Sequence, residues 1–268
     1  MEGNATFLPS TTPRFNCDFL PQRSGILDRL AINDVRYNDL PRIYMPPQLK
    51  FQLKIALGVV CILAAYCAGS GRVDLWPGWC YAGYFLLMLT LSHSVLSRVA
   101  PDLIQERVSV HAGSLRWDTA IVGWLAMSPI VTCLVAGLDA RRNGVDYPLY
   151  KVLLGYALAI CGSALTHSAM AVNRFYAPTV RIQADRGHTV VEAGPYRQIR
   201  HPGNLGNVLL NTVTPLMLAS RWAWIPAGVS ILLIFGRTFL EDRFLCVELQ
   251  GYSGFAGRTR SRLLPGIW

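Results

Sequence analysis

Long apolar runs are the feature of this sequence that most restricts its fold. Five stretches, at about 51–69, 76–96, 117–138, 148–172 and 222–240, each hold roughly the 20 residues that cross about 30 Å of hydrocarbon as a helix. A backbone inside a bilayer must satisfy its own hydrogen bonds, so such runs form helices. Hydrophobic residues make up 52% of the 268 residues and charged residues only 15%, against about 25% in soluble domains. The sequence therefore predicts an all-α, polytopic membrane helical bundle.

A sixth apolar segment, at about 205–219, is shorter and more polar than the others. It contains Asn207, Asn211, Thr212, Thr214 and Pro215. Because only two residues separate it from the run that follows, the last two of the six segments are predicted to form a tight helical hairpin. Polar groups at membrane depth are tolerated where they face protein or a cavity, so we expect a site near this hairpin.

The net charge of +9 comes almost entirely from arginine, and its distribution predicts an orientation. Arginines gather after the second run, after the fourth run and in the tail: Arg98, Arg107, Arg116, Arg174, Arg181, Arg186, Arg197, Arg200, Arg243, Arg258, Arg260 and Arg262. With an even number of crossings these segments share a side with the N-terminus, and that side is predicted to be cytosolic. Arg141 and Arg142 lie on the opposite side and count against this. We expect a multi-pass membrane protein with its termini and active site in the cytosol.

The composition also bears on the partners and the domains. No basic stretch is interleaved with exposed aromatic residues, so the charge predicts contact with membrane lipid and not with nucleic acid. The cysteines are scattered and predict neither a metal site nor a disulfide framework. Residues 1–45 form a polar arm, in which 26–43 is interpreted either as an amphipathic surface helix or as solvated chain. Residues 46–268 form the membrane domain.

The segment 181–206 carries the residues that most suggest chemistry. His201 and Pro202 place a titratable ring where a helix begins, because proline suits the first helical turn. The free N–H groups at a helix start suit an anionic group. Further on, Arg237 and Glu241 share one helix face near the membrane edge, where charges are costly unless paired or functional. Two interpretations stay open. In one, the loop only binds lipid headgroups and Arg237 and Glu241 form a structural ion pair; in the other, these residues form a binding site.

Taken together, these residues resemble the isoprenylcysteine carboxyl methyltransferase family. The likeness is strongest over about 173–268, weaker over 100–172, and absent from 1–45. It rests on Gly194-Pro195-Tyr196-Arg197, Arg200-His201-Pro202, Gly206, Arg237, Glu241-Asp242, Leu245, Gly251-Tyr252, Arg262 and Pro265, with Glu106-Arg107, Gly113 and Trp117-Asp118 upstream.

The resemblance implies a membrane enzyme that uses S-adenosylmethionine, with the donor in a cytosolic pocket formed mainly by about 173–268. The implied donor-binding residues are Arg181, His188, Thr189, Val190, Val191, Tyr196, His201, Pro202, Gly203, Asn204 and Glu241. Arg237, which would meet the substrate, and Glu241 are the implied catalytic residues, and no metal is implied. Methyl transfer from a sulfonium depends chiefly on in-line positioning and desolvation. The implied acceptor is a hydrophobic small molecule or lipid-like compound whose carboxylate Arg237 could orient.

Three positions depart from the family pattern, and several alternatives stay open. Asn204 stands where the family usually has tyrosine, Asp242 where it has a second glutamate, and Phe255 where it has tyrosine. These changes suggest an acceptor other than a prenylated cysteine. The acceptor could instead be a lipid amine, which needs a base. An NADPH-dependent sterol-reductase-like enzyme shares the Arg-His-Pro motif, although Asn207 stands near its expected acid. A non-catalytic membrane scaffold is the last alternative.

Three polar residues in or beside the apolar runs have plainer interpretations. His93 and His167 are predicted to be core histidines that bond to a neighbouring helix. Asp118 is predicted to cap or pair, with a role near the acceptor as the alternative.

Overall fold

The structure is a computed structural model that describes residues 46–99, 101, 114–145 and 147–268. These residues all fall within Met45–Trp268, one of the two compact units of the chain. The predictions made for the arm 1–45, and for Glu106, Arg107 and Gly113, lie outside the described residues.

Helices are the only regular elements in the described part of the chain. The long ones are α1 (Pro47–Ser70), α2 (Trp76–Val99), α4 (Arg116–Asn143), α5 (Leu149–Val172) and α7 (Trp224–Glu248), joined by α6 (Pro202–Met217), α8 (Tyr252–Arg258) and two 3₁₀ turns, Ala184–Arg186 and Gly194–Arg197. The five long helices have the length and apolar composition needed to cross a membrane. The all-α polytopic bundle is therefore confirmed, and α6, with 16 residues, is the short polar segment.

The outer surface of the bundle is apolar. Leu57, Ile225 and Leu232 are 64%, 71% and 73% exposed. An apolar surface of this extent would aggregate in water but suits hydrocarbon. The helices therefore hide their polar groups inside and present their apolar groups to the membrane.

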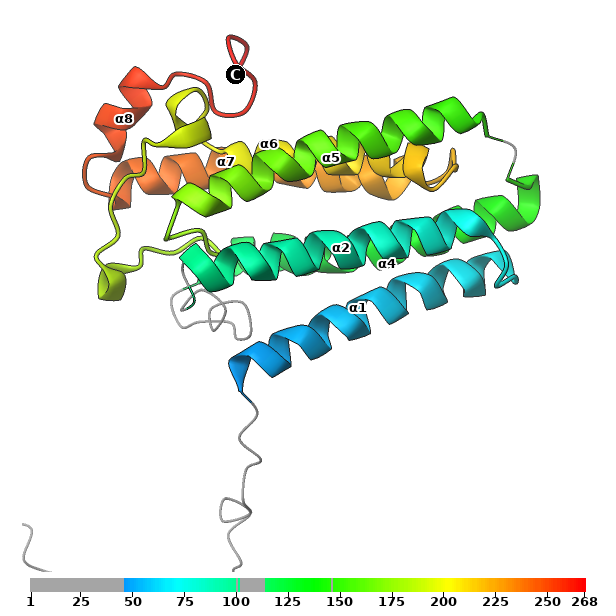
Figure 1. Cartoon of the computed structure of the whole chain (residues 1–268). Helices are drawn as coiled ribbons and strands as arrows, with labels where there is room; N and C mark the ends of the chain where they lie inside the picture. Colours follow the sequence, from blue (N-terminus) through cyan, green and yellow to red (C-terminus); the bar gives the residue numbers. More distant parts are fainter. Residues whose placement is uncertain (1–45, 100, 102–113, 146) are drawn as a thin grey trace, which may run out of the picture. The chain divides into compact units, whose positions relative to one another are not determined.

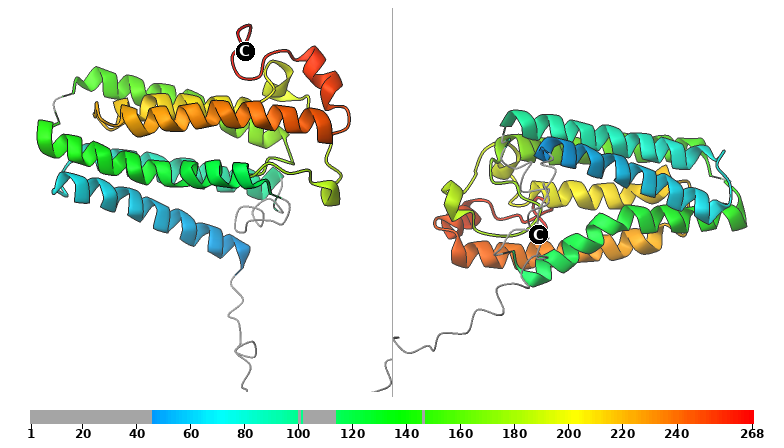
Figure 2. Two further views of the ribbon diagram at one scale, coloured as in Figure 1. Left: turned by 180° about the vertical axis from the view of Figure 1, so that it is seen from behind. Right: turned by 90° about the horizontal axis from the view of Figure 1, so that it is seen from below.

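Successive helices from α1 to α7, with α6 included, run in alternating directions, so that loops far apart in the sequence meet at one end (Figure 1). The start of α6, the loop before it, α8 and the C-terminus all lie at this end, and the view from below in Figure 2 agrees. The predicted grouping of the arginine-rich loops fits this arrangement. The side of the membrane that this end faces stays a prediction.

The C-terminal end of α7 differs from the predicted one. The helix α7 continues to Glu248, well past 240, because the hydropathy pattern ends where the helix leaves the membrane and not where the helix itself ends.

Asp139 on α4 holds the turn between α6 and α7: its Oδ2 accepts bonds from Ser220 Oγ at 2.6 Å, Arg221 N at 2.8 Å and Trp222 N at 3.1 Å. The hairpin is therefore fixed by a helix outside it.

The helix α6 lies unusually close to α5. A Cβ added at Gly206 would lie 2.1 Å from Thr166 Oγ1 and 2.7 Å from the Gly162 carbonyl oxygen, so only glycine fits. Small residues allow such close approach between membrane helices. This contact fixes the N-terminal half of α6, which carries the candidate site.

Candidate functional site

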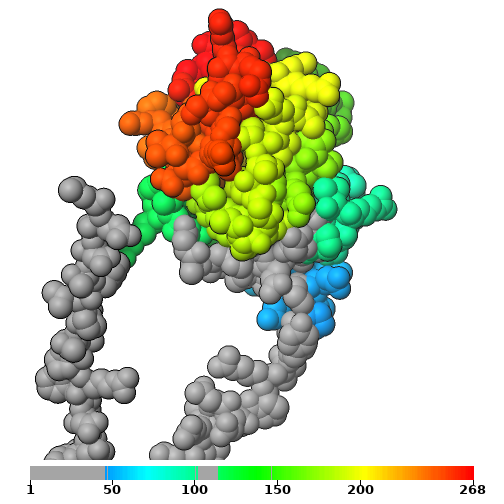
Figure 3. Space-filling view, turned by 90° about the vertical axis from the view of Figure 1, so that its left-hand side faces the viewer, coloured from blue at the N-terminus to red at the C-terminus, as the bar shows by residue number. Residues whose placement is uncertain are grey.

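A pocket opens at the end of the bundle where the loop, α6, α7 and α8 meet. Figure 3 looks onto this end and shows the loop in yellow-green beside α7, α8 and the tail in orange and red. The pocket is lined by ten of the eleven predicted donor-binding residues and by Arg237: Arg181, His188, Thr189, Val190, Val191, Tyr196, His201, Gly203, Asn204, Glu241 and Arg237. Pro202 alone among the predicted residues is not in the lining. It is buried at the first position of α6, where it begins the helix.

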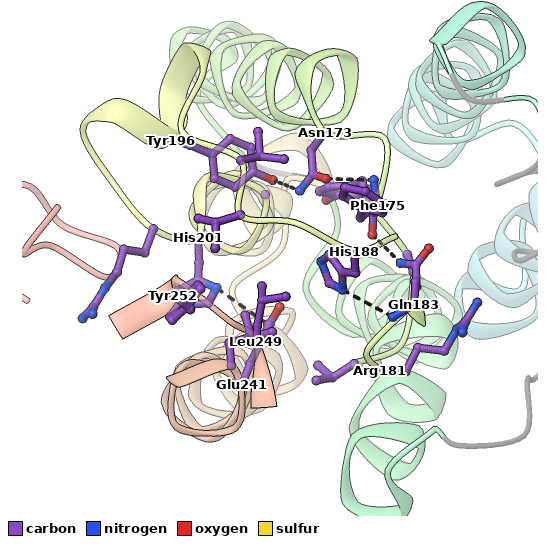
Figure 4. Close-up of a pocket in the computed structure, with 18 of the residues that line it drawn as sticks. Asn173, Phe175, Arg181, Gln183, His188, Tyr196, His201, Glu241, Leu249 and Tyr252 are labelled. Atoms are coloured by element: carbon purple, nitrogen blue, oxygen red, sulfur yellow. Dashed lines mark hydrogen bonds and ion pairs between the residues drawn. The ribbon is translucent and has the colours of Figure 1, made fainter. Parts of the chain in front are cut away.

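The loop between α5 and α6 forms one wall of the pocket. Gln183 is buried, and its side-chain Nε2 donates to the Phe175 carbonyl at 2.7 Å. The His188 ring lies beside the Phe175 ring, as the close-up in Figure 4 shows. The two ring centroids are 4.6 Å apart. Burial, together with Arg181 and Arg186, lowers the pKa of His188 below its ordinary value. The wall therefore presents a neutral imidazole at neutral pH.

Two aromatic residues fix where this loop meets α6. The Asn173 amide donates to Tyr196 Oη at 2.9 Å, and burial raises the pKa of Tyr196 above its ordinary value, so the phenol keeps its proton. A Cβ at Gly203 would lie 2.4 Å from Tyr176 Oη, so glycine is needed for the Tyr176 ring to pack against the start of α6. The sequence at this helix start thus shapes the pocket as well as the helix.

Arg237 is held by a carboxylate from a distant helix. Its Nε donates to Asp118 Oδ1 at 2.7 Å, and Nη2 donates to the Pro178 carbonyl at 3.0 Å. Asp118 is 0% exposed, and its Oδ2 accepts the Val180 N–H at 2.6 Å. The prediction that Asp118 caps or pairs is confirmed. The interaction ties α4, α7 and the start of the loop into one unit.

Asn204 joins Arg237 to Glu241. Its Oδ1 accepts from Arg237 Nη1 at 3.1 Å, while its Nδ2 donates to Glu241 Oε2 and to Thr238 Oγ1, both at 3.1 Å. The predicted alternative of a direct Arg237–Glu241 ion pair is wrong, because Arg237 pairs with Asp118 and reaches Glu241 only through this amide. A tyrosine hydroxyl has a single O–H and could not donate to both Glu241 and Thr238, so the departure at 204 has a structural consequence.

Asp242 is the centre of a second network, behind the pocket. It accepts bonds from Tyr252 Oη at 3.0 Å and Arg262 Nε at 2.8 Å, lies 3.2 Å from His201 Nε2, and forms an ion pair with Arg200 at 3.3 Å. Burial and the nearby Asp242 carboxylate raise the pKa of Tyr252, which keeps it a donor. This network attaches α8 and the tail to α6 and α7, and so closes the pocket.

Several lining residues were missed by the sequence analysis. Asn173, Phe175 and Tyr176 follow directly after α5, and Gln183 and Leu249 also line the pocket. The available signal was the aromatic pair at the exit of a membrane helix, just before the segment 181–206.

Of the two histidines predicted to bond to a neighbouring helix, His167 does bond to Ser92 on α2, at 2.9 Å. The Nε2 of His93, by contrast, is buried without a partner in the described structure, and its ring instead stacks on Phe51.

Residues 154–247 match the model of the isoprenylcysteine carboxyl methyltransferase (ICMT) family. The match covers about a third of the chain, from within α5 through the loop and α6 to nearly the end of α7. It confirms the resemblance to this family over these residues, and it supports a membrane methyltransferase. A search among curated proteins finds no match.

Proposed function

We propose that this ICMT-like membrane methyltransferase takes its methyl group from S-adenosylmethionine and transfers it to a carboxylate on a hydrophobic small-molecule or lipid-like acceptor. One observation carries the proposal: a carboxylate on α7 and an extended loop segment with unused backbone groups line the same pocket. The donor has an ammonium group at one end and a nucleobase at the other, and the pocket offers a partner for each.

The segment Thr189–Val191 suits the adenine. Its backbone N–H and C=O groups make no hydrogen bond with any other described residue. Val190 and Val191 pack against the cluster formed by Tyr196, Leu249 and Tyr252. An apolar slot beside unpaired backbone groups can both stack a purine and bond to its edge.

Glu241 suits the ammonium group. Its Oε2 is bonded to Asn204, but Oε1 has no hydrogen-bond partner among the described residues, and the side chain is 21% exposed. A charge-assisted bond to this oxygen would anchor the amino-acid end of the donor. Arg181, which lines the opposite wall, would meet the donor carboxylate.

S-adenosylmethionine supplies an electrophilic methyl group on a sulfonium sulfur. The protein's part is to align and desolvate the acceptor. Arg237 has five N–H groups, of which three are bonded to Asp118, Asn204 and Pro178, so two can orient an acceptor oxygen. An ionised carboxylate has no proton to lose on methylation, so the absence of an assigned base is no obstacle.

The test is calorimetric titration of the purified protein with S-adenosylmethionine. The native protein is expected to bind it, and Glu241→Gln to weaken binding at least tenfold, about 1.4 kcal/mol. Glu248→Gln is the matched control, because Glu248 lies on the same helix but outside the pocket lining. His201→Ala is expected to weaken binding as well.

Two outcomes would contradict the whole proposal, and a third would contradict half of it. Binding of NADPH in place of S-adenosylmethionine would favour the reductase-like alternative. Binding of neither would favour a scaffold. If donor binding is present but only amines are methylated, the donor half of the proposal survives and the carboxylate half fails.

A further inference from the structure

A second cavity, of about 340 Å³, lies between the membrane helices α2, α4, α5, α6 and α7. Tyr176 lines both this cavity and the pocket described above. On α6, Gly203 and Asn204 face the pocket, while Asn207, one turn further along, faces the cavity. The cavity therefore adjoins the proposed donor site on the side that faces into the bundle.

Much of the polar lining of this cavity is satisfied by the protein itself. The Tyr84 hydroxyl donates to the Ala159 carbonyl at 2.9 Å and lies 2.6 Å from Ser163 Oγ. His167 bonds to the Ser163 carbonyl at 2.7 Å and to Ser92 at 2.9 Å. These groups need no ligand.

Three polar groups in the lining have no partner among the described residues. The side-chain amide of Asn207 makes no hydrogen bond. Asn211 donates through Nδ2 to the Asn207 carbonyl, but its own Oδ1 is unpaired. Thr132 on α4 is 3% exposed, and its hydroxyl has no bond. An unpaired amide at membrane depth costs free energy, so its presence needs a ligand or a solvent molecule to account for it.

The spacing of these groups gives the ligand a length. Asn207 and Asn211 are three and seven residues along α6 from Asn204, which at about 1.5 Å per residue is roughly 4.5 and 10 Å. A molecule with its reacting group beside Arg237 and Asn204 would extend past both amides. Around the amides the wall is apolar, with Phe85, Leu89 and Ile234 among its residues.

We propose that this cavity binds the body of the methyl acceptor, and that the acceptor is an oxygenated hydrophobic molecule whose hydroxyl or carbonyl group bonds to Asn207, Asn211 or Thr132. This inference rests on the proposed function, since it gives the acceptor of that reaction a chemical class. A plain hydrocarbon tail would leave all three groups unpaired, and it is therefore the wrong class of occupant.

Oleic and ricinoleic acid are suitable probes, because they share a chain and a carboxylate and differ by one mid-chain hydroxyl. Binding of each radiolabelled acid is measured with the full chain in phosphatidylcholine nanodiscs, with empty nanodiscs subtracted. Asn207→Leu removes the amide at similar volume. Thr132→Val removes a cavity hydroxyl, and Thr90→Val is its control, because Thr90 is exposed on α2 outside the cavity lining.

The native protein is expected to bind ricinoleic acid at least tenfold more tightly than oleic acid. Asn207→Leu should weaken the binding of ricinoleic acid at least fivefold and the binding of oleic acid less than twofold. Thr132→Val should change the two affinities in the same direction. Thr90→Val should change neither affinity. Equal effects on the two acids, no effect on either, or native protein that binds neither acid would overturn the inference.

The affinity for S-adenosylmethionine is measured on the same samples. Failure of the native protein to bind it, with the preference for ricinoleic acid intact, would refute the proposed function and not the cavity's selectivity. Donor binding with no preference between the acids would refute the selectivity alone.

Discussion

Two buried aspartates on α4 show how one residue type performs two tasks in this bundle. Asp139 is 6% exposed and binds neutral donors: a serine hydroxyl, two backbone N–H groups and the Asn143 amide at 2.7 Å. Asp118, at the other end of the helix, is 0% exposed and binds a cation, Arg237, together with one N–H. The first fixes a turn, and the second fixes a charged group in a pocket wall.

The difference between the two lies in what removal would leave behind. Neutral donors released from Asp139 can be met by water at the turn. A guanidinium released from Asp118 would stay charged while only 9% exposed and without its bonded carboxylate, and breaking a buried ion pair is among the costliest defects. The comparison predicts that the Asp118 region couples stability to ligand binding, whereas the Asp139 region affects stability alone.

The largest effect is expected from Asp118→Asn. It removes the only carboxylate that Arg237 bonds to directly among the described residues, and breaking a buried pair costs about 3–5 kcal/mol. Thermal unfolding in detergent should show the loss, and the affinity for S-adenosylmethionine should fall with it. The double variant Asp118→Asn/Arg237→Gln should recover part of the stability. A single variant that unfolds like the native protein would remove the basis of the comparison.

Asp139→Asn should cost less, about 2 kcal/mol, because an amide oxygen still accepts from the hairpin turn but without the charge that strengthens those bonds. Its affinity for S-adenosylmethionine should stay within twofold of the native value. A tenfold fall in that affinity would show that the two ends of α4 are not independent.

Asn204→Leu tests the amide that joins Arg237 to Glu241. It removes three hydrogen bonds from a buried site, two of them to charged groups, and should cost about 1–2 kcal/mol. Because Glu241 loses its positioning partner, donor affinity should fall more than with Asp139→Asn. Thermal unfolding and calorimetric titration of one preparation measure the loss of stability and the loss of donor affinity, respectively. Unchanged donor affinity would mean that Glu241 is positioned without Asn204.

The smallest expected effect concerns pH. The pKa of His188 in the folded chain lies below its ordinary value, about 6.5, so the unfolded chain binds a proton first as pH falls. The native protein should therefore lose stability as pH drops below about 6.5, by less than about 1 kcal/mol. His188→Asn lacks this dependence, so the difference in Tm between the two proteins should change between pH 7.5 and 5. A constant difference would contradict the assignment.

The fold could be predicted because each membrane helix is specified locally. Apolar runs of about 20 residues gave the five long helices, and the polar content of 205–219 marked α6 as different. The end of α7 could not be predicted from hydropathy, because helix and membrane do not end at the same residue. Gly206 is recognisable in the sequence only as a motif glycine. Its close contact with α5 could not be predicted, because no local sequence pattern encodes a packing distance between helices.

The site was predictable where its residues form a motif, and not where they meet from afar. The segment His188–Val191 and the start of α6 were identified from the resemblance, and the structure places them in one lining. Asp118 and Arg237 are 119 residues apart, so their contact follows from the arrangement of helices and not from spacing. The hint available was the presence of a carboxylate at a helix start in a membrane protein, where charges need partners. Asp139, a carboxylate near the other end of the same apolar run, is a second charge that needs partners.

Tyr176 lines both the pocket and the cavity, so binding of a ligand in one can be coupled to binding of a ligand in the other. A ligand that shifts the ring in one cavity changes the shape of the other, and the resulting coupling free energy is the same in both directions. If the donor improves acceptor binding by some factor, the acceptor must improve donor binding by that factor. The order in which the two ligands bind is then set by their concentrations as well as by the protein.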